Sequence, residues 1–243
     1  MMADDQGAGR CQVAIVGGGL AGLALAEQLQ QAGLDFQLFE ARDRLGGRIE
    51  STTCRGAGFD LGPSWFWSIQ PRMAALCERL GLGVFEQYST GDLLFEDADR
   101  QVHRGAGHAS MEGSLRIEGG AGALTEALAA RLPEQRVHLG TSVQKVQADG
   151  QLMLKDGSGW QAERIVLALP PRLSAQLDFE PALDAREHQL LAAAPTWMAG
   201  VAKFLAVYEA PFWRQDGLSG DAMSRSGPLM EIHDASPRSG QPG

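Results

Sequence analysis

The feature that most constrains the fold is a glycine cluster that separates a short apolar run from an Ala/Leu-rich segment. Residues 12–16 (QVAIV) read as a buried strand, and residues 20–31 keep apolar side chains near helical spacing. Gly33 is a typical helix stop, and residues 36–39 (FQLF) read as a second strand. Strand, helix and strand within about 30 residues make a β-α-β unit, which predicts an α/β fold with parallel strands.

The glycines have the spacing of a dinucleotide-binding turn. Gly17, Gly19 and Gly22 form G-x-G-x-x-G. The first glycine permits a tight turn, the second lets a pyrophosphate approach the backbone, and the third lets helix and strand pack closely. Leu20 and Ala21 begin the helix, whose positive end would face the pyrophosphate. An ordinary glycine-rich turn is the alternative, because the chain has 31 glycines.

An acidic residue after the second strand supports the dinucleotide interpretation. Glu40 lies 18 residues beyond Gly22, where the carboxylate that binds the ribose hydroxyls is expected. The same carboxylate repels a 2′-phosphate, so a ligand of the NADP type is disfavoured.

A second loop after Glu40 bears on which dinucleotide is bound. Gly46, Gly47 and Arg48 offer backbone N–H groups and a guanidinium beside the pyrophosphate. An NAD site does not need this extra loop, whereas FAD, which extends further across a protein, could use it. Arg48 is the candidate phosphate ligand, and Arg42 is the candidate for the ribose or a nearby ion pair. Solvated surface charges are the alternative for both arginines.

Composition and charge exclude several classes of function. The formal net charge is −9, whereas a nucleic-acid-binding domain presents a basic face. The three cysteines are widely spaced and the five histidines lack metal-ligand spacing, so neither a disulfide framework nor a metal site is predicted. The N-terminus lacks the basic start of a signal peptide, and no stretch approaches the roughly 20 apolar residues of a membrane helix. We therefore expect a cytoplasmic protein with no nucleic-acid or membrane partner.

The rest of the chain alternates turn-rich segments with short predicted elements. Residues 56–68 read as loop and turn, and residues 91–113 give no clear pattern. Asp149-Gly150 and Asp156-Gly157 are hairpin turn signals within a β-rich region. Helices are expected at residues 72–80, 123–132 and 182–194, and strands at residues 137–139, 143–147, 152–154, 165–169 and 200–208.

Several segments follow one another in an order that is specific when taken together. They are EARDRLGGRIES (40–51), GAGFDLGPSWF (56–66), RIEGGAGALTEALAARL (116–132), VHLGTSVQKV (137–146), RIVLALPPRL (164–173) and VAKFLAVYEAPFWRQDGLSG (201–220). In this order they resemble the flavin amine oxidase family, which includes monoamine, polyamine and L-amino-acid oxidases. The last segment is similar to bacterial monoamine-oxidase-like members, and the resemblance covers most of residues 11–236.

This resemblance implies a Rossmann-like FAD-binding domain of α/β class with a β-meander, together with an α+β substrate domain. The FAD-binding domain is expected to be discontinuous, with residues 11–68 and 112–172. The substrate-binding domain is expected to comprise residues 69–111 and 173–243.

The resemblance also completes the set of predicted cofactor contacts. It implies that residues 62–65 lie along the flavin ring and that the backbone of Val143 pairs with the adenine, although Val143 reads otherwise as a plain strand residue. The predicted FAD-binding residues are Gly17, Gly19, Leu20, Ala21, Gly22, Glu40, Ala41, Arg42, Gly46, Gly47, Arg48, Gly62, Pro63, Ser64, Trp65 and Val143.

The implied chemistry is the oxidation of an amine. The flavin N5 would accept a hydride from the carbon next to the amine nitrogen, the imine would hydrolyse, and O2 would reoxidise the flavin to give peroxide. Lys203 is the predicted catalytic residue, because a lysine in the apolar run VAKFL is costly without a task or a partner. The family carries a lysine at the matching position, where it holds a water against N5. An edge-strand lysine that reaches solvent is the alternative.

Aromatic residues suggest the class of amine. An aromatic-lined pocket suits an amine with an apolar or aromatic group, although ordinary core packing would explain the same residues. The candidate pocket walls are Trp65, Phe66, Trp67, Phe212 and Trp213.

The sequence departs from the family towards its end. The family continues with more substrate-domain sheet, a glycine-rich flavin-binding motif and a final helix, whereas this chain ends in EIHDASPRSGQPG (231–243). We therefore expect an incomplete substrate domain, which a second chain or a C-terminal part would complete. One alternative is a non-catalytic FAD-binding fragment or split subunit. Another is a protoporphyrinogen-oxidase-like or phytoene-desaturase-like flavoenzyme, but the PFWR run (211–214) favours the amine oxidase.

Overall fold

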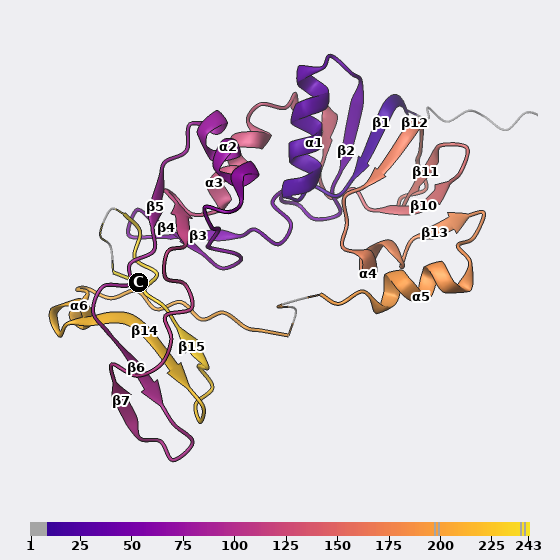
Figure 1. Cartoon of the computed structure of the whole chain (residues 1–243). Helices are drawn as coiled ribbons and strands as arrows, with labels where there is room; N and C mark the ends of the chain where they lie inside the picture. Colours follow the sequence, from indigo (N-terminus) through magenta and orange to yellow (C-terminus); the bar gives the residue numbers. More distant parts are fainter. Residues whose placement is uncertain (1–8, 197, 199, 239, 241) are drawn as a thin grey trace, which may run out of the picture. The chain divides into compact units, whose positions relative to one another are not determined.

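The chain forms two compact units (Figure 1). The first unit combines Met1–Arg48 with Thr125–Ala202, and the second combines Ile49–Leu124 with Lys203–Gly243. The computed structural model describes residues 9–196, 198, 200–238, 240 and 242–243.

The compact units do not follow the domain boundaries expected from the sequence. Residues 49–68 and 112–124 pack within the second unit, and residues 173–202 pack within the first. The division into FAD-binding and substrate-binding stretches remains a prediction, because packing alone does not say which residues bind a ligand.

The first unit is built on a seven-stranded sheet in the order β13-β10-β11-β12-β1-β2-β9. Strands β12, β1, β2 and β9 run parallel, as the β-α-β pattern predicts, and the antiparallel pairs β10·β11 and β11·β12 form the expected meander. The strands are β1 (Gly9–Val16), β2 (Phe36–Phe39), β9 (Val137–His138), β10 (Val143–Gln147), β11 (Gln151–Leu154), β12 (Gly159–Leu167) and β13 (Asp178–Glu180).

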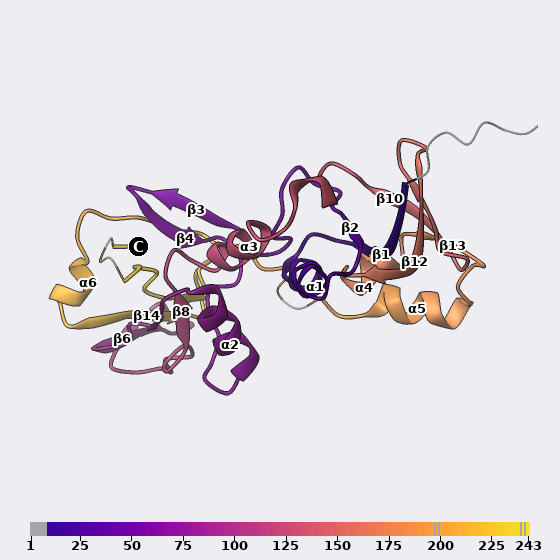
Figure 2. The same ribbon diagram turned by 90° about the horizontal axis from the view of Figure 1, so that it is seen from above.

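Helix α1 (Leu20–Gln31) has the bounds predicted from the sequence and lies beside β1 and β2 in Figures 1 and 2. Its side chains Leu23 and Ala26 are fully buried. Burial of a leucine side chain stabilises the fold by about 1.5–3 kcal/mol. The helix ends where Gly33 takes a φ of 68° and the Leu34 N–H donates to the Leu29 carbonyl over 3.0 Å. Gly33 is thus confirmed as the residue that stops the helix.

The turns of the meander also follow the sequence. Gly150 and Gly157 have φ values of 92° and 88°, which residues with a side chain rarely adopt. The two Asp-Gly pairs therefore mark turns, as predicted. Strand β12 begins six residues earlier than expected, at Gly159, because Trp160 and Gln161 pair with β11 and with β1. Other helical elements of this unit are η1 (Glu134–Arg136), α4 (Pro171–Ser174) and α5 (Ala185–Ala193). Helix α3 (Gly122–Ala129) contains the boundary between the two units, which falls between Leu124 and Thr125.

Strand β12 has one partly open edge. It pairs with β1 as far as Leu167, but β11 reaches only Gly159–Gln161 on its other side. Among the described residues no strand pairs with the outer edge beyond that point. Val166 is consequently exposed, and Ile165 is only partly buried, although their apolar run reads as a strand that is covered on both faces.

The described residues of the second unit form three small sheets and two helices. A four-stranded sheet has the order β15-β14-β6-β7, and two antiparallel pairs, the hairpin β3·β4 and the pair β5·β8, lie outside it. The elements are β3 (Ser51–Cys54), β4 (Ala57–Asp60), β5 (Val84–Glu86), β6 (Asp92–Glu96), β7 (Val102–Arg104), β8 (Leu115–Ile117), β14 (Leu218–Ser224), β15 (Glu231–Ile232), α2 (Pro71–Leu80) and α6 (Phe212–Gln215).

Two predictions about secondary structure were wrong. Residues 56–68 are not all loop, because β4 pairs with β3 through a two-residue turn at Arg55 and Gly56. Both turn residues have positive φ, 51° and 78°, which matches the twist of a tight hairpin. Residues 200–208 do not form the predicted strand, because no segment in the described part of the chain pairs with this apolar run, and Phe204 is 75% exposed.

A further glycine-rich turn, Gly119–Gly122, is hydrogen-bonded to Asp60 and Ser51. The Asp60 carboxylate accepts hydrogen bonds from the Ala121 N–H (2.7 Å) and the Ser51 hydroxyl (2.6 Å). The Ser51 oxygen in turn accepts from the Gly122 N–H over 3.0 Å. A carboxylate and a hydroxyl therefore satisfy N–H groups at the start of α3, where such groups lack partners within the helix.

Candidate functional site

The β1–α1 turn needs its glycines for steric reasons. Gly17 has a φ of 112°, and a Cβ on it would lie 2.6 Å from the Ala168 carbonyl oxygen. A Cβ on Gly22 would lie only 1.9 Å from the Gly17 carbonyl oxygen. The first and third glycines of the motif therefore make the close turn and the close helix–strand packing that the sequence predicts.

The N-terminus of α1 suits an anion. Gly19 is the N-cap, no side chain caps it, and the first turn, which includes Leu20 and Ala21, carries no acidic residue. The N–H groups of a first turn lack partners within the helix, and the helix dipole is positive there. Its place directly after the glycine turn fits a pyrophosphate.

Glu40 joins the end of β2 to the glycine turn. Its side chain is 8% exposed, and its two oxygens accept hydrogen bonds from the Gly18 N–H (2.7 Å) and the Arg42 N–H (3.0 Å). Each carboxylate oxygen has a second lone pair, so both oxygens can still accept from ribose hydroxyls. The two backbone bonds fix the carboxylate beside the turn.

Replacing Glu40 with glutamine is expected to weaken FAD binding about 10- to 100-fold. A glutamine side chain loses the charge and turns an N–H towards one of the two backbone donors, and hydrogen bonds to a charged group are worth about 1.5–3 kcal/mol. Flavin fluorescence during titration of flavin-free protein measures the change. Glu163→Gln, at an exposed position on β12, is the matched control. An unchanged Kd for Glu40→Gln would contradict the assigned role.

The second loop packs against the first. The Gly46 N–H donates to the Gly18 carbonyl over 2.9 Å, and Gly19 and Gly46 form a parallel bridge. The Arg42 and Arg44 guanidinium groups both donate to the Gly47 carbonyl, over 3.1 and 3.2 Å. Arg42 and Arg44 therefore both stabilise this loop. The sequence did not indicate this role for either arginine.

These residues of the first unit fit the ADP part of FAD. At Gly17 and Gly22 the glycine turn leaves no room for a side chain, the helix end offers N–H groups, and the carboxylate of Glu40 faces the same turn. Arg48 is exposed, so its guanidinium is accessible to a phosphate. Val143 is 7% exposed and pairs with Leu154, and its contact with adenine remains a prediction.

In the second unit the structure brings Lys203 to the segment predicted to line the flavin ring. The Lys203 ammonium donates to the Ser64 hydroxyl (2.6 Å) and to the Gly62 carbonyl (3.0 Å). It also lies 5.2 Å from the centroid of the Trp65 ring, within the range of a cation–π interaction. Lys203 comes from the irregular segment after residue 200, so it is placed by these contacts and not by a strand.

Lys203 is exposed as a whole residue, although its ammonium is partly removed from water by its neighbours. Burial lowers its pKa below the ordinary value, Asp60 opposes that effect, and Arg116 adds to it. Arg116 is itself 4% exposed, and burial lowers its pKa as well. An ammonium has three N–H donors, and the contacts above occupy two of them. The third donor can bind a water or a substrate atom.

Sequence reasoning missed the polar residues that support this segment. Gln87 accepts a hydrogen bond from the Trp65 indole over 2.9 Å, and Asp234 accepts one from the Trp213 indole over 2.8 Å. Arg116 donates to the main-chain carbonyls of residues 235 and 236. No local pattern reveals these residues, because their partners lie far away in sequence.

The predicted pocket aromatics differ in exposure. Phe66 is 4% exposed and Trp213 is 7% exposed, so both contribute to the packing of the second unit. Phe212 is 52% exposed, and Trp67 is partly exposed. Contact of any of these residues with a substrate remains a prediction.

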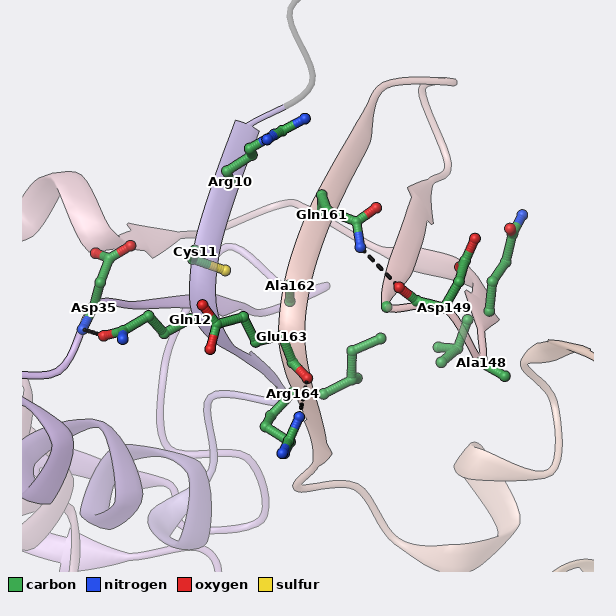
Figure 3. Close-up of a pocket in the computed structure, with 14 residues that line it drawn as sticks. Arg10, Cys11, Gln12, Asp35, Ala148, Asp149, Gln161, Ala162, Glu163 and Arg164 are labelled. Carbon is green, nitrogen blue, oxygen red and sulfur yellow. Dashed lines mark hydrogen bonds between the residues drawn. The ribbon is translucent and has the colours of Figure 1, made fainter.

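A separate cavity of about 710 Å³ lies in the first unit (Figure 3). It is at the end of β1 and β12 away from the glycine turn, and charged side chains such as Arg10, Glu163 and Arg164 line it. Cys11 forms part of its wall, and burial, with a smaller effect of the negative Asp35, raises the pKa of that thiol to about 11. This cavity therefore lies apart from the glycine turn and from Glu40.

Cys11 is expected to resist alkylation at pH 8. With a pKa of about 11 its thiolate fraction there is about 100-fold smaller than that of an ordinary cysteine, and only the thiolate reacts. Iodoacetamide labelling followed by mass spectrometry of the peptides measures the rates. The partly exposed Cys54 provides the reference in the same protein. Equal rates at Cys11 and Cys54 would show that Cys11 is accessible and ionised.

The part of the chain that the structure describes holds no candidate for two other kinds of site. No group of His, Cys, Asp or Glu side chains there could hold a metal ion. No helix in the same residues is long and apolar enough to cross a membrane.

Comparison with known proteins gives two family matches. Residues 15–80 match the NAD(P)-binding Rossmann-like domain, and residues 107–241 match the flavin containing amine oxidoreductase family. The fold is also that of solved amine oxidases. A putrescine oxidase bound to putrescine superposes with a TM-score of 0.82 at 23% identity, over 96% of this chain and 74% of the other. The cyclohexylamine oxidase of Brevibacterium oxydans superposes with a TM-score of 0.81 at 18% identity, over 96% and 73%.

Two curated relatives align along most of the chain. They are a probable flavin-containing monoamine oxidase A of Dictyostelium discoideum, at 25% identity over 92% of this chain and 71% of the relative, and the putrescine oxidase of Kocuria rosea, at 24% over 91% and 69%. The first alignment runs over 325 positions, while 92% of this chain is about 224 residues. About 100 positions of that relative within the aligned span therefore have no counterpart here, which the motif order did not reveal.

The Rossmann-like match contains the glycine turn, Glu40 and the second loop. The amine oxidoreductase match contains Lys203 and covers more than half of the chain. The cofactor is therefore FAD, as the sequence predicts, and the chain belongs to the flavin containing amine oxidoreductase family.

Proposed function

We propose that this chain oxidises an amine with an apolar or aromatic substituent and that O2 is the final electron acceptor. The overall reaction converts the amine, O2 and water into an aldehyde, ammonia and hydrogen peroxide. When bound, FAD would accept the hydride from the carbon next to the amine nitrogen. The relatives named for monoamine and putrescine oxidation support the amine as the substrate class.

The observation that carries the proposal is the position of Lys203. Its ammonium donates hydrogen bonds to Gly62 and Ser64. These two residues belong to segment 62–65, which the resemblance to flavin amine oxidases assigns to the flavin ring. Its remaining donor can hold a water in place, and its positive charge stabilises negative charge that develops nearby.

The amine must lose its proton before hydride leaves the adjacent carbon, because an ammonium nitrogen has no lone pair to stabilise the imine. A positive neighbour favours the neutral amine. Lys203 and Arg116 are two positive groups of the second unit that could act in this way, and Arg116 lowers the pKa of Lys203. This supports a substrate that reacts as the neutral amine.

The test is direct. The purified chain is examined for the visible absorption bands of bound flavin, and peroxide release is measured with a panel of aliphatic, aromatic and diamine substrates. Yellow protein that releases peroxide with one amine class supports the proposal. Yellow but inert protein would instead indicate an FAD-binding fragment that needs a second chain, and colourless protein would contradict tight FAD binding.

A further inference from the structure

A buried glutamine connects two distant parts of the second unit. Gln87 is 4% exposed, and its side-chain oxygen accepts the Trp65 indole N–H over 2.9 Å. Its side-chain nitrogen donates to the main-chain oxygens of Asp234 (2.7 Å) and Tyr88 (3.1 Å). The acceptor and both N–H donors of the amide are therefore engaged, which fixes its orientation.

Asp234, which accepts a hydrogen bond from Gln87 through its main-chain oxygen, is held by several hydrogen bonds of its own. Asp234 is 2% exposed, and its carboxylate accepts hydrogen bonds from the Trp213 indole (2.8 Å), the Arg214 guanidinium (2.7 Å) and the Ser236 N–H (2.8 Å). The Arg214 guanidinium also stacks over the Tyr88 ring at 3.8 Å. Buried polar networks with satisfied partners hold a single arrangement, so Asp234 is a fixed anchor for Gln87.

At its other end, Gln87 binds the Trp65 indole, and the Lys203 ammonium lies over the face of that ring. Among the described residues no carboxylate lies within ion-pair distance of Lys203, and its contacts are Ser64, Gly62 and the Trp65 face. A cation–π attraction depends on the cation lying over the face of the ring. Rotation of the indole would remove that attraction, and the hydrogen bond to Gln87 opposes rotation.

Other charged groups also act on this site. Asp60 and Arg116 influence Lys203 through space, in opposite directions. The His233 ring packs edge-on against Trp65 at 5.1 Å and is itself bound to Asp221 over 2.7 Å. None of these groups bonds to the indole nitrogen, whose partner is Gln87.

We infer that Gln87 is a positioning residue for Lys203, and that it acts through the orientation of the Trp65 indole. The arrangement itself rests on contacts within the second unit. Its meaning for catalysis rests on the proposed function.

The experiment measures the Lys203 amine directly and needs neither flavin nor turnover. The chain has three lysines, Lys145, Lys155 and Lys203. Trace acetylation over a range of pH, followed by mass spectrometry, gives the rate and the apparent pKa of each lysine. Lys155 is exposed and serves as the reference within every sample.

Gln87→Met keeps a side chain of similar size but makes no hydrogen bond to the indole. The charged form of Lys203 then loses the support of the ring face, while the neutral form loses nothing. We expect its apparent pKa to fall by about 0.5, which makes acetylation about threefold faster at a fixed pH below the midpoint. Gln101→Met, at an exposed turn of the same unit, is the matched control and should leave Lys203 unchanged.

A double-mutant comparison separates positioning from general loosening. Trp65→Phe keeps an aromatic face but has no N–H for Gln87, so Gln87→Met should add nothing further in that background. A full additional effect there would overturn the inference, as would an unchanged or raised apparent pKa in Gln87→Met alone. Should Gln87→Met fail to fold, Gln87→Asn, which withdraws the amide by one methylene, gives the same test. An inactive protein that passes this test would contradict the proposed function alone.

Discussion

Replacing Lys203 with methionine is expected to lower the rate of amine oxidation by O2 about 100-fold while FAD remains bound. The substitution removes the ammonium that Gly62 and Ser64 hold in place, together with the water that its third donor can bind. Removal of one preorganised donor commonly costs a factor of about 10²–10³. Stopped-flow measurement of flavin reduction by the amine and of reoxidation by O2 shows which half-reaction slows.

The control for this substitution is Lys155→Met, which removes an exposed lysine and should leave both rates unchanged. Methionine has no charge to desolvate, so Lys203→Met is not expected to unfold the protein, since burial already disfavours the charged lysine. Wild-type rates for both half-reactions in Lys203→Met would remove Lys203 from the mechanism.

Gly22→Ala is expected to have the largest effect on the first unit. The new Cβ would lie 1.9 Å from the Gly17 carbonyl oxygen, which belongs to the backbone and cannot rotate away. Helix α1 must therefore move from β1, at a cost of about 3 kcal/mol in the free energy of unfolding. Its N-terminus moves with it, so we expect FAD to bind about 100-fold more weakly. Urea unfolding of the flavin-free protein and a flavin titration measure the two effects.

Gly159→Ala separates the steric cost from the general effect of a glycine substitution. Gly159 lies in β12 of the same unit and has no positive φ, and a Cβ on it would meet its nearest neighbour at an ordinary contact distance of 3.6 Å. We expect that variant to stay within about 0.5 kcal/mol of the parent. If Gly22→Ala were equally mild, the close packing of helix and strand at this turn would not be needed.

The sequence predicts the first unit well because its signals are local. The helix after the glycine turn ends where Gly33 indicates, and the Asp-Gly pairs mark the turns of the meander. Each of these features depends on residues within one turn or one hairpin. Strand β12 begins earlier than predicted because its first residues are selected by pairing with β11 and β1, which a local pattern does not contain.

The segment around Lys203 shows where local signals fail. VAKFL has the composition of a strand, but a strand also needs a partner, and none pairs with it among the described residues. The sequence indicates that Lys203 needs a task or a partner, but the polar groups that the structure places beside it, Gly62 and Ser64, are about 140 positions away. Gln87 and Asp234 lie 22 and 21 positions from the tryptophans they bind, which is beyond the reach of a helical or strand pattern, so the sequence did not reveal them.

Beyond Gln161, no described strand pairs with the outer edge of β12, so self-association through this edge can be tested separately from conformational stability. An unpaired, apolar strand edge is a template for the addition of an extended chain, whether or not the fold behind it is stable. Glu163 and Arg164 place charges near the start of that edge, but Ile165, Val166 and Leu167 have none. A substitution that strengthens the sheet leaves this template intact, whereas a charge introduced at the exposed Val166 would oppose self-association without adding to the free energy of folding.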